Sequence, residues 1–221
     1  MNHARTAGAP RRRPVQKRSA ARFERLLDAC AELLDEVGYA ALTTKEVARR
    51  AGVPIGTLYQ FFPDQQGLIG ALAARNLNAF VERVSARLES ERPEDVSGIV
   101  DVTVDEFVAM RRTVAGFGVV DFGATGQDHV LDATLDNNTA VAGRLRGLVP
   151  ALTGIQDDAE LEIAVRVALE CADSVLNLAF QADPHGDPRL IAECKRVLNS
   201  YLSDRIGSRT AGASSAVSGR P

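Results

Sequence analysis

The positions of the prolines constrain the fold of this chain more than any other feature of its sequence. The 221 residues contain nine prolines, and none of them interrupts a long segment of helical periodicity. Proline inside a helix removes a hydrogen bond and clashes with the preceding turn, so prolines are expected between helices. The pattern predicts helices separated by breakers, and we assign the chain to the all-α fold class.

Apolar residues recur at spacings of three and four residues through most of the chain, as they do on the buried face of a helix. Residues 96–104 alternate in places as a strand would, but a longer helical stripe through Val108 favours a helix. Residues 116–126 are too rich in glycine to assign, and we expect a short helix with loops there. The expected helices cover residues 26–37, 45–51, 55–62, 65–88, 96–108, 128–148, 158–181 and 188–205.

Capping residues mark where several of these helices begin and end. Gly38 follows the first stripe as a C-cap, Thr44 is the candidate N-cap of the next helix, and Asp64 can cap the long helix. Pro54 stands where a first-turn proline belongs. Residues 183–188 contain two prolines and a glycine, which is a strong turn signal between the last two helices.

Composition changes at both ends of the chain. Residues 1–16 are rich in Arg, Ala and Pro and lack periodicity, so we expect a flexible basic arm. Residues 207–221 are small and polar, and we expect a disordered tail. Between these ends we predict a small three-helix domain over residues 17–63 and a larger helical domain over residues 64–206.

The net charge of −3 conceals an uneven distribution. Residues 1–62 hold eleven Lys and Arg against six Asp and Glu, a net charge of +5, whereas the remainder of the chain carries −8. A basic end on an acidic body indicates a segment that binds a polyanion, although a basic tail that only aids solubility gives the same pattern. Charge alone leaves both interpretations open.

Several functional classes lack their sequence features here. No stretch approaches the roughly 18 uncharged apolar residues of a membrane span, and the N-terminus has no apolar signal region. Cys30, Cys171 and Cys194 are odd in number and have no CxxC spacing, which argues against disulfides and a zinc knuckle and favours the cytoplasm. His129 cannot share a helical face closely with both Asp128 and Asp132, no second histidine is nearby, and no catalytic or dinucleotide motif is present. We therefore predict no metal site, no cofactor and no enzymatic activity.

Residues 42–72 are the most informative segment of the chain. Two short helices joined by a turn that contains Gly52 have the proportions of a helix-turn-helix, in which the second helix enters the major groove of DNA. We expect Val53, Leu58 and Phe62 to point inward. The residues expected on the exposed face are Ile55, Thr57, Tyr59 and Gln60, with Phe61 as a further candidate.

This segment resembles the DNA-binding domain of the tetracycline-repressor (TetR) family of bacterial transcriptional regulators. The resemblance covers residues 18–72 with the family's order and spacing. The matching residues are Gly38-Tyr39, Leu42-Thr43-Thr44, Val47-Ala48, Ala51-Gly52-Val53, Gly56-Thr57-Leu58-Tyr59, Phe62 and Leu68.

The resemblance implies that the third helix is the recognition helix. Two positions depart from the family pattern: Pro54 replaces a frequent Ser at the start of this helix, and Gln65 replaces a Lys that grips phosphate. One lost charged contact lowers the salt slope of binding by about 0.9. Basic residues near the N-terminus, including Arg11 and Arg12, can compensate through phosphates or the minor groove. The implied phosphate contacts are Thr44, Thr57 and Tyr59, the implied base contacts are Lys45, Ile55 and Gln60, and the flanking candidates are Gln65, Arg13, Lys17 and Arg18.

The resemblance also implies that the larger domain senses a small molecule and forms a homodimer through its last two helices. Both sets of candidate residues can equally fill the core of one subunit, and an amphipathic stripe does not distinguish the two roles. Few of the ligand candidates are charged, which favours a hydrophobic effector. The ligand candidates are Phe107, Met110, Phe117, Phe122, Leu135, Asn138, Glu170, Asn177 and Phe180. The dimer candidates are Val165, Ala168, Ala172, Val175, Leu176, Leu190, Cys194, Val197, Leu198 and Tyr201.

From these features we expect a homodimeric DNA-binding repressor, released from a palindromic DNA operator by a small hydrophobic ligand. One alternative is an activator or a ligand-independent regulator with the same DNA-binding domain. An alternative from another class is a helical small-molecule-binding or interaction protein that has lost DNA binding. Sequence-specific, salt-dependent DNA binding distinguishes the first two from the third.

Overall fold

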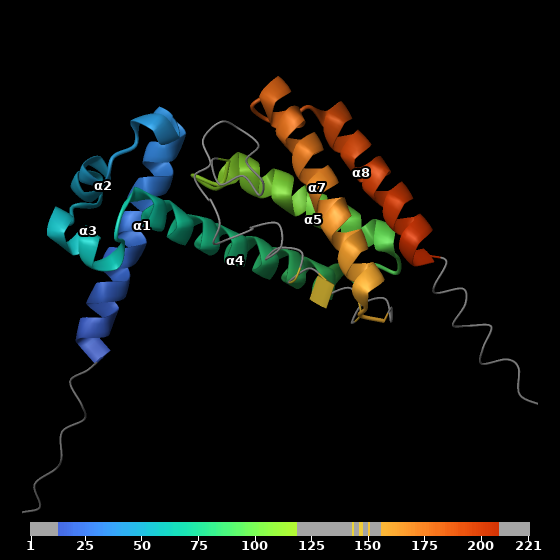
Figure 1. Cartoon of the computed structure of the whole chain (residues 1–221), viewed down its shortest axis with the longest axis horizontal. Coiled ribbons are helices and arrows are strands. Elements are labelled where there is room, and N and C mark those ends of the chain that lie inside the picture. Colours follow the sequence, from blue (N-terminus) through green and yellow to red (C-terminus); the bar gives the residue numbers. More distant parts are fainter. Residues whose placement is uncertain (1–12, 119–142, 144–145, 148–149, 151–155, 208–221) are drawn as a thin grey trace, which may run out of the picture. The chain divides into compact units, whose positions relative to one another are not determined.

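The computed structural model describes residues 13–118, 143, 146–147, 150 and 156–207 (Figure 1). Within these residues the regular elements are helices and none is a strand, so the all-α prediction is confirmed. No helix of the described part is long and apolar enough to cross a lipid bilayer. Most of the helix expected over residues 128–148, and the tail from residue 208, lie outside the described residues.

The chain divides into two compact units, Met1–Leu72 and Ala73–Pro221. The division falls within α4 (Gln65–Glu91), beyond the boundary expected at residue 63, because the first turns of α4 belong to the first unit. Leu68 and Leu72 of these turns are fully buried.

The first unit is built on α1 (Arg13–Ala41), which packs against α2 (Thr44–Ala51) and α3 (Ile55–Phe61). The helix α1 starts at Arg13, so it includes the last four residues of the expected arm. Gly38 has a φ of 73° and interrupts α1 where a C-cap was predicted, before a further turn to Ala41. The buried apolar residues of α1 are Leu26, Leu27, Ala29, Cys30, Ala31, Leu33 and Leu34.

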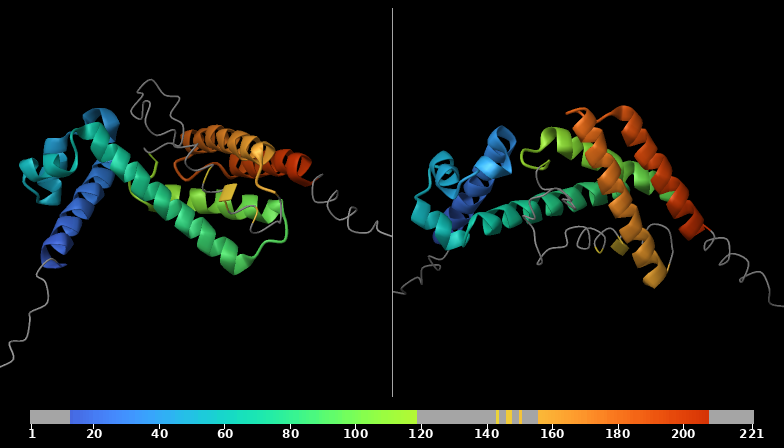
Figure 2. Two further views of the ribbon diagram at one scale, coloured as in Figure 1. Left: turned by 60° about the horizontal axis from the view of Figure 1, so that its bottom comes forward. Right: turned by 45° about the horizontal axis from the view of Figure 1, so that its top comes forward.

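The second unit contains the rest of α4, α5 (Val96–Thr113), α7 (Ala159–Ala182), α8 (Pro188–Leu202) and the π-helix η1 (Ser203–Gly207). The helices α7 and α8 lie side by side as a hairpin in both Figure 1 and Figure 2, and α8 also packs on α5. The predicted turn between them closes where the amide of Asp187 donates to the carbonyl of Ala179 at 3.0 Å.

Ion pairs connect the helices of the second unit. Lys195 on α8 reaches Asp105 at 2.7 Å and Asp101 at 3.3 Å, both on α5. Glu106 of α5 is 5% exposed and pairs with Arg83 and Arg87 of α4. A carboxylate buried to this degree needs opposite charge nearby, and the two arginines supply it.

Candidate nucleic-acid interface

The two short helices of the first unit are held in place by a small apolar core. Val47 on α2 and Leu58 on α3 are fully buried, and Val53 in the turn between them is 5% exposed. Helices of seven and eight residues are too short to be stable alone, so tertiary packing fixes them. The inward positions predicted for Val53, Leu58 and Phe62 are confirmed.

The turn between α2 and α3 depends on a left-handed glycine. Gly52 has a φ of 61° and caps α2 with its amide, which donates to the carbonyl of Arg49 at 3.2 Å. The amide of Val53 then donates to the carbonyl of Ala48 at 3.0 Å. Residues with a Cβ are strained in this conformation, so glycine sets the angle between the two helices.

The caps at the starts of α2 and α3 differ from those predicted. The N-cap of α2 is Thr43, whose hydroxyl accepts from the amide of Glu46 at 3.2 Å, whereas Thr44 is the first helical residue. Thr44 is wrong as a cap because the extended backbone that a cap requires occurs one residue earlier. Pro54 precedes α3 rather than occupying its first turn, and its carbonyl accepts from the amide of Thr57 at 2.8 Å.

The outer face of α3 presents the side chains expected of a recognition helix. Ile55 is 41% exposed, Tyr59 is 52% exposed, and Gln60 is exposed. Thr57 is half-buried. These residues lie on one anchored helix, which is the arrangement that brings side chains to base edges in a major groove.

The start of α2 lies beside this face. The hydroxyls of Thr44 and Tyr59 are 3.1 Å apart and share a hydrogen bond. Lys45 is exposed in the same turn. The structure therefore brings together two hydroxyls that the family resemblance implied as phosphate contacts.

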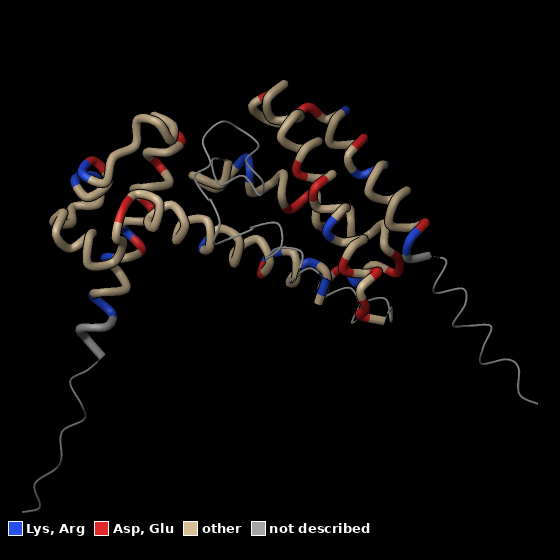
Figure 3. Tube along the Cα trace, viewed as in Figure 1, with Lys and Arg blue, Asp and Glu red and all other residues tan. Residues whose placement is uncertain are grey.

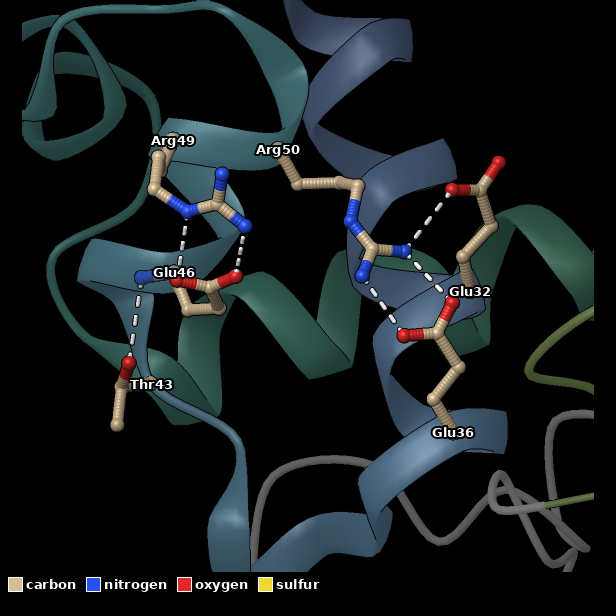
Figure 4. A network of polar contacts seen from close by, with 6 residues as sticks. All are labelled: Glu32, Glu36, Thr43, Glu46, Arg49 and Arg50. Carbon is tan, nitrogen blue, oxygen red and sulfur yellow. Dashed lines mark hydrogen bonds and ion pairs between the residues drawn. The ribbon is translucent and has the colours of Figure 1, made fainter.

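Two arginines of α2 are bound to carboxylates (Figure 4). Arg50 donates two hydrogen bonds of 2.7 Å to Glu36 on α1 and one of 3.5 Å to Glu32. These hydrogen bonds lower the pKa of Glu36 and raise that of Arg50. Arg49 forms a separate pair with Glu46 at 2.5 and 2.9 Å. No local sequence pattern predicts the Arg50 contacts, because they depend on how α2 packs against α1.

The remaining candidates of this unit take different positions. Gln65 is the half-buried first residue of α4, and Lys17 and Arg18 are exposed on α1. Arg13 begins α1, whereas Arg11 and Arg12 lie outside the described residues. Phe61 is half-buried rather than exposed, because its ring packs against Phe23 of α1 at 5.7 Å.

The ligand candidates separate into core and surface residues. Phe107, Met110 and Phe117 are buried together, and the rings of Phe107 and Phe117 lie 5.5 Å apart. Glu170 is exposed, and half-buried Asn177 donates to Asp173 at 3.3 Å. The guanidinium of Arg111 covers the ring of Phe180 at 5.2 Å. The candidates outside the described residues are Phe122, Leu135 and Asn138.

Half of the dimer candidates are buried within the subunit itself. Ala172, Val175, Leu190 and Tyr201 are half-buried, and Val197 is 45% exposed. The large apolar side chains exposed on α7 are instead Ile163, Val167 and Leu178, which are not among the predicted dimer residues. The buried candidates are Val165, Ala168, Leu176, Cys194 and Leu198.

Both units match known protein families. Residues 26–72 match the bacterial regulatory proteins of the tetR family, and residues 94–206 match the tetracyclin repressor-like C-terminal domain. The second match by itself covers more than half of the chain.

Individual relatives agree with this assignment. The chain is 24% identical over 118 residues to the HTH-type regulator YvdT of Bacillus subtilis and 33% identical over 89 residues to BetI of Escherichia coli. These segments cover 53% and 38% of this chain, and 60% and 46% of the relatives' own lengths.

Solved structures extend the similarity over most of the chain. A TetR-family regulator from Streptomyces coelicolor is 40% identical, with a TM-score of 0.74, covering 84% of this chain and 99% of its own. RolR, solved with its ligand resorcinol, shares the fold at 20% identity and a TM-score of 0.57, covering 86% of this chain and 95% of its own. The chain therefore belongs to the TetR family of bacterial transcriptional regulators, and its first unit is a DNA-binding helix-turn-helix domain.

Proposed function

We propose that the protein is a homodimeric repressor that binds a palindromic operator and is released from it by a small, largely hydrophobic molecule. The observation that carries the proposal is the outer face of α3, where Ile55, Tyr59 and Gln60 are exposed on a helix anchored by Leu58. Because α3 is already ordered, its exposed side chains can contact base edges with no further loss of backbone conformational entropy on binding.

The individual contacts follow from the chemistry of each side chain. Gln60 can form two hydrogen bonds with an adenine, and Ile55 can pack against a thymine methyl group. Lys45 is a third base-reading candidate, and Thr57 a further phosphate contact. The hydroxyls of Thr44 and Tyr59 are close enough to bind one phosphate between them.

Dimerisation would double the length of DNA that the protein reads, because each subunit supplies one recognition helix. Ile163, Val167 and Leu178 are 55%, 38% and 51% exposed and recur along one side of α7, with Val197 exposed on α8. Apolar side chains exposed in this number favour an interface with a second copy. The half-buried candidates Ala172, Val175, Leu190 and Tyr201 would contribute at its edges.

The proposed effector is aromatic or apolar and accepts a hydrogen bond. Phe80, Phe107 and Phe117 form an aromatic cluster in the second unit, and Asn76 precedes Phe80 by one turn of α4. Asn76 is 3% exposed, and its Nδ2 has no hydrogen-bond partner among the described residues. A buried amide donor gains from an acceptor, which a ligand oxygen would supply. Resorcinol, the ligand of RolR, is an aromatic molecule with such oxygens.

Release would follow from a shift between two conformations of the dimer. A ligand that binds more tightly to the conformation with wrongly spaced recognition helices lowers operator affinity by the ratio of its two affinities. A ligand with equal affinity for both conformations would leave the operator bound.

The test is selection from a random-sequence duplex library, followed by titration of the selected site at several salt concentrations. The proposal predicts a palindromic site and a steep loss of affinity with salt. Phenolic and fatty compounds are then screened for release of that site. Selection of a palindrome that no compound releases would favour the ligand-independent regulator or activator, and no selection at all would favour a helical binding protein without DNA function.

A further inference from the structure

We propose that Arg18, Arg22 and Arg25 form a basic row on α1 that binds the phosphate backbone of the operator beside the groove that α3 enters. The inference rests on the proposed DNA binding. It adds Arg22 and Arg25 to the residues that contact DNA and gives them a partner, the backbone of the same duplex.

The basic row lies on one side of α1. Its members are separated by four and three residues, which is the spacing of neighbours on a helix surface, and all three are exposed. Glu32 and Glu36 continue the same side in the second half of the helix. Along α1 the charged residues are mostly basic toward its start and acidic toward its end (Figure 3).

The negative charges of Glu32 and Glu36 are already paired with an arginine of the same unit. Arg50 binds Glu36 through two hydrogen bonds and reaches Glu32 (Figure 4). The side chains of the three arginines of the basic row form no hydrogen bond, ion pair or ring contact with any residue that the structure describes. Exposed cations without carboxylate partners beside a DNA-binding helix are typical of a surface that binds a polyanion.

Phe23 links the basic row to the recognition helix. It follows Arg22 in the chain, and its ring packs against Phe61 at 5.7 Å and Phe62 at 5.1 Å, at the end of α3. The backbone of Arg22 is thereby held next to that end of α3. A major groove is only about 12 Å wide, so the ends of a helix inside it lie close to the phosphates at its edges. The basic row lies where such phosphates would pass.

Arg49 provides a matched contrast in the same unit. The side chain of Arg49 is 69% exposed, but its guanidinium already donates hydrogen bonds to the carboxylate of Glu46. An arginine whose charge is neutralised by a carboxylate displaces fewer counterions when it approaches DNA. Substitution of Arg49 and of Arg22 by glutamine changes the net charge equally, so an effect of net charge alone would be the same for both variants.

The experiment measures operator affinity of the full chain between 50 and 200 mM salt. The variants are Arg22→Gln, Arg25→Gln, the double variant, the charge-conserving Arg22→Lys/Arg25→Lys variant, and Arg49→Gln as control. Each lost phosphate contact lowers the slope of log affinity against log salt by about 0.9. From 50 to 200 mM salt, the factor by which affinity falls should therefore be about 12 times smaller for the double variant than for wild type. Thermal unfolding of each variant checks that the fold is retained.

The expected pattern is a lower slope for the glutamine variants, a wild-type slope for the lysine variant, and a smaller change for Arg49→Gln. A wild-type slope in the Arg22→Gln/Arg25→Gln variant would overturn the inference. So would a decrease for Arg49→Gln equal to that for Arg22→Gln, because the effect would then be one of net charge. Failure of the wild-type protein to bind any duplex would instead refute the proposed function itself.

Discussion

Replacing Leu58 with alanine is expected to detach α3 from the first unit and to abolish DNA binding. Leu58 is completely buried and is the one fully buried residue described within α3, a helix of seven residues. The substitution removes three carbon atoms, worth about 2.4 kcal/mol of transfer free energy. The cavity left behind raises the expected loss in the free energy of unfolding to about 3 to 4 kcal/mol.

The assay combines urea unfolding with amide hydrogen exchange. The chain contains no tryptophan, so far-UV circular dichroism is the suitable probe of unfolding. Gln60→Ala is the control on the same helix, because Gln60 is exposed and its removal should change stability by less than about 0.5 kcal/mol while weakening DNA binding. If Leu58→Ala lowers the free energy of unfolding by less than about 1 kcal/mol and the amides of α3 remain protected from hydrogen exchange, Leu58 does not anchor the helix.

Three further substitutions or modifications test local features. Gly52→Ala should lower the free energy of unfolding by about 1 kcal/mol, because φ is 61° and the space around the new Cβ is open, and an unchanged urea midpoint would contradict this. Arg92 follows α4 with a φ of 46°, a left-handed conformation that glycine adopts with less strain. Arg92→Gly should therefore raise the free energy of unfolding by about 1 kcal/mol, which calorimetry would detect as a higher Tm. Burial raises the pKa of the Cys194 thiol to about 11, so at pH 8 very little thiolate forms. Alkylation followed by mass spectrometry should label half-buried Cys171 first, and faster labelling of Cys194 in the folded protein would contradict the assigned burial.

Local sequence signals predicted the framework of the helix-turn-helix. The glycine in its turn, Gly52, is left-handed, and Asp64 caps α4 by accepting from the amide of Gly67 at 2.8 Å. Such features depend on a few neighbouring residues and on backbone sterics, so they can be read from the sequence. The cap of α2 shows the limit of this reading, because Thr43 and Thr44 have the same side chain and only the backbone conformation distinguishes them.

Periodicity alone could not choose between the core of one subunit and an interface between two. Leu176, Cys194 and Leu198 belong to clear apolar stripes, and the structure buries all three within the subunit. Ile163 and Leu178 are exposed on the other side of α7 and do not belong to the predicted apolar stripe. An amphipathic pattern indicates that a helix has an apolar face, but it does not indicate which neighbouring element covers that face.

By itself, the sequence determined the all-α class and the approximate bounds of most helices, α3 included, because these follow from proline, glycine and capping positions and from short-range periodicity. Only the tertiary structure decided that Glu36 binds Arg50, that the ring of Phe23 packs at the end of α3, and that no residue in the described part of the chain pairs with the side chains of the basic row. These contacts join residues distant in the chain, and their existence depends on how the helices pack rather than on any local preference.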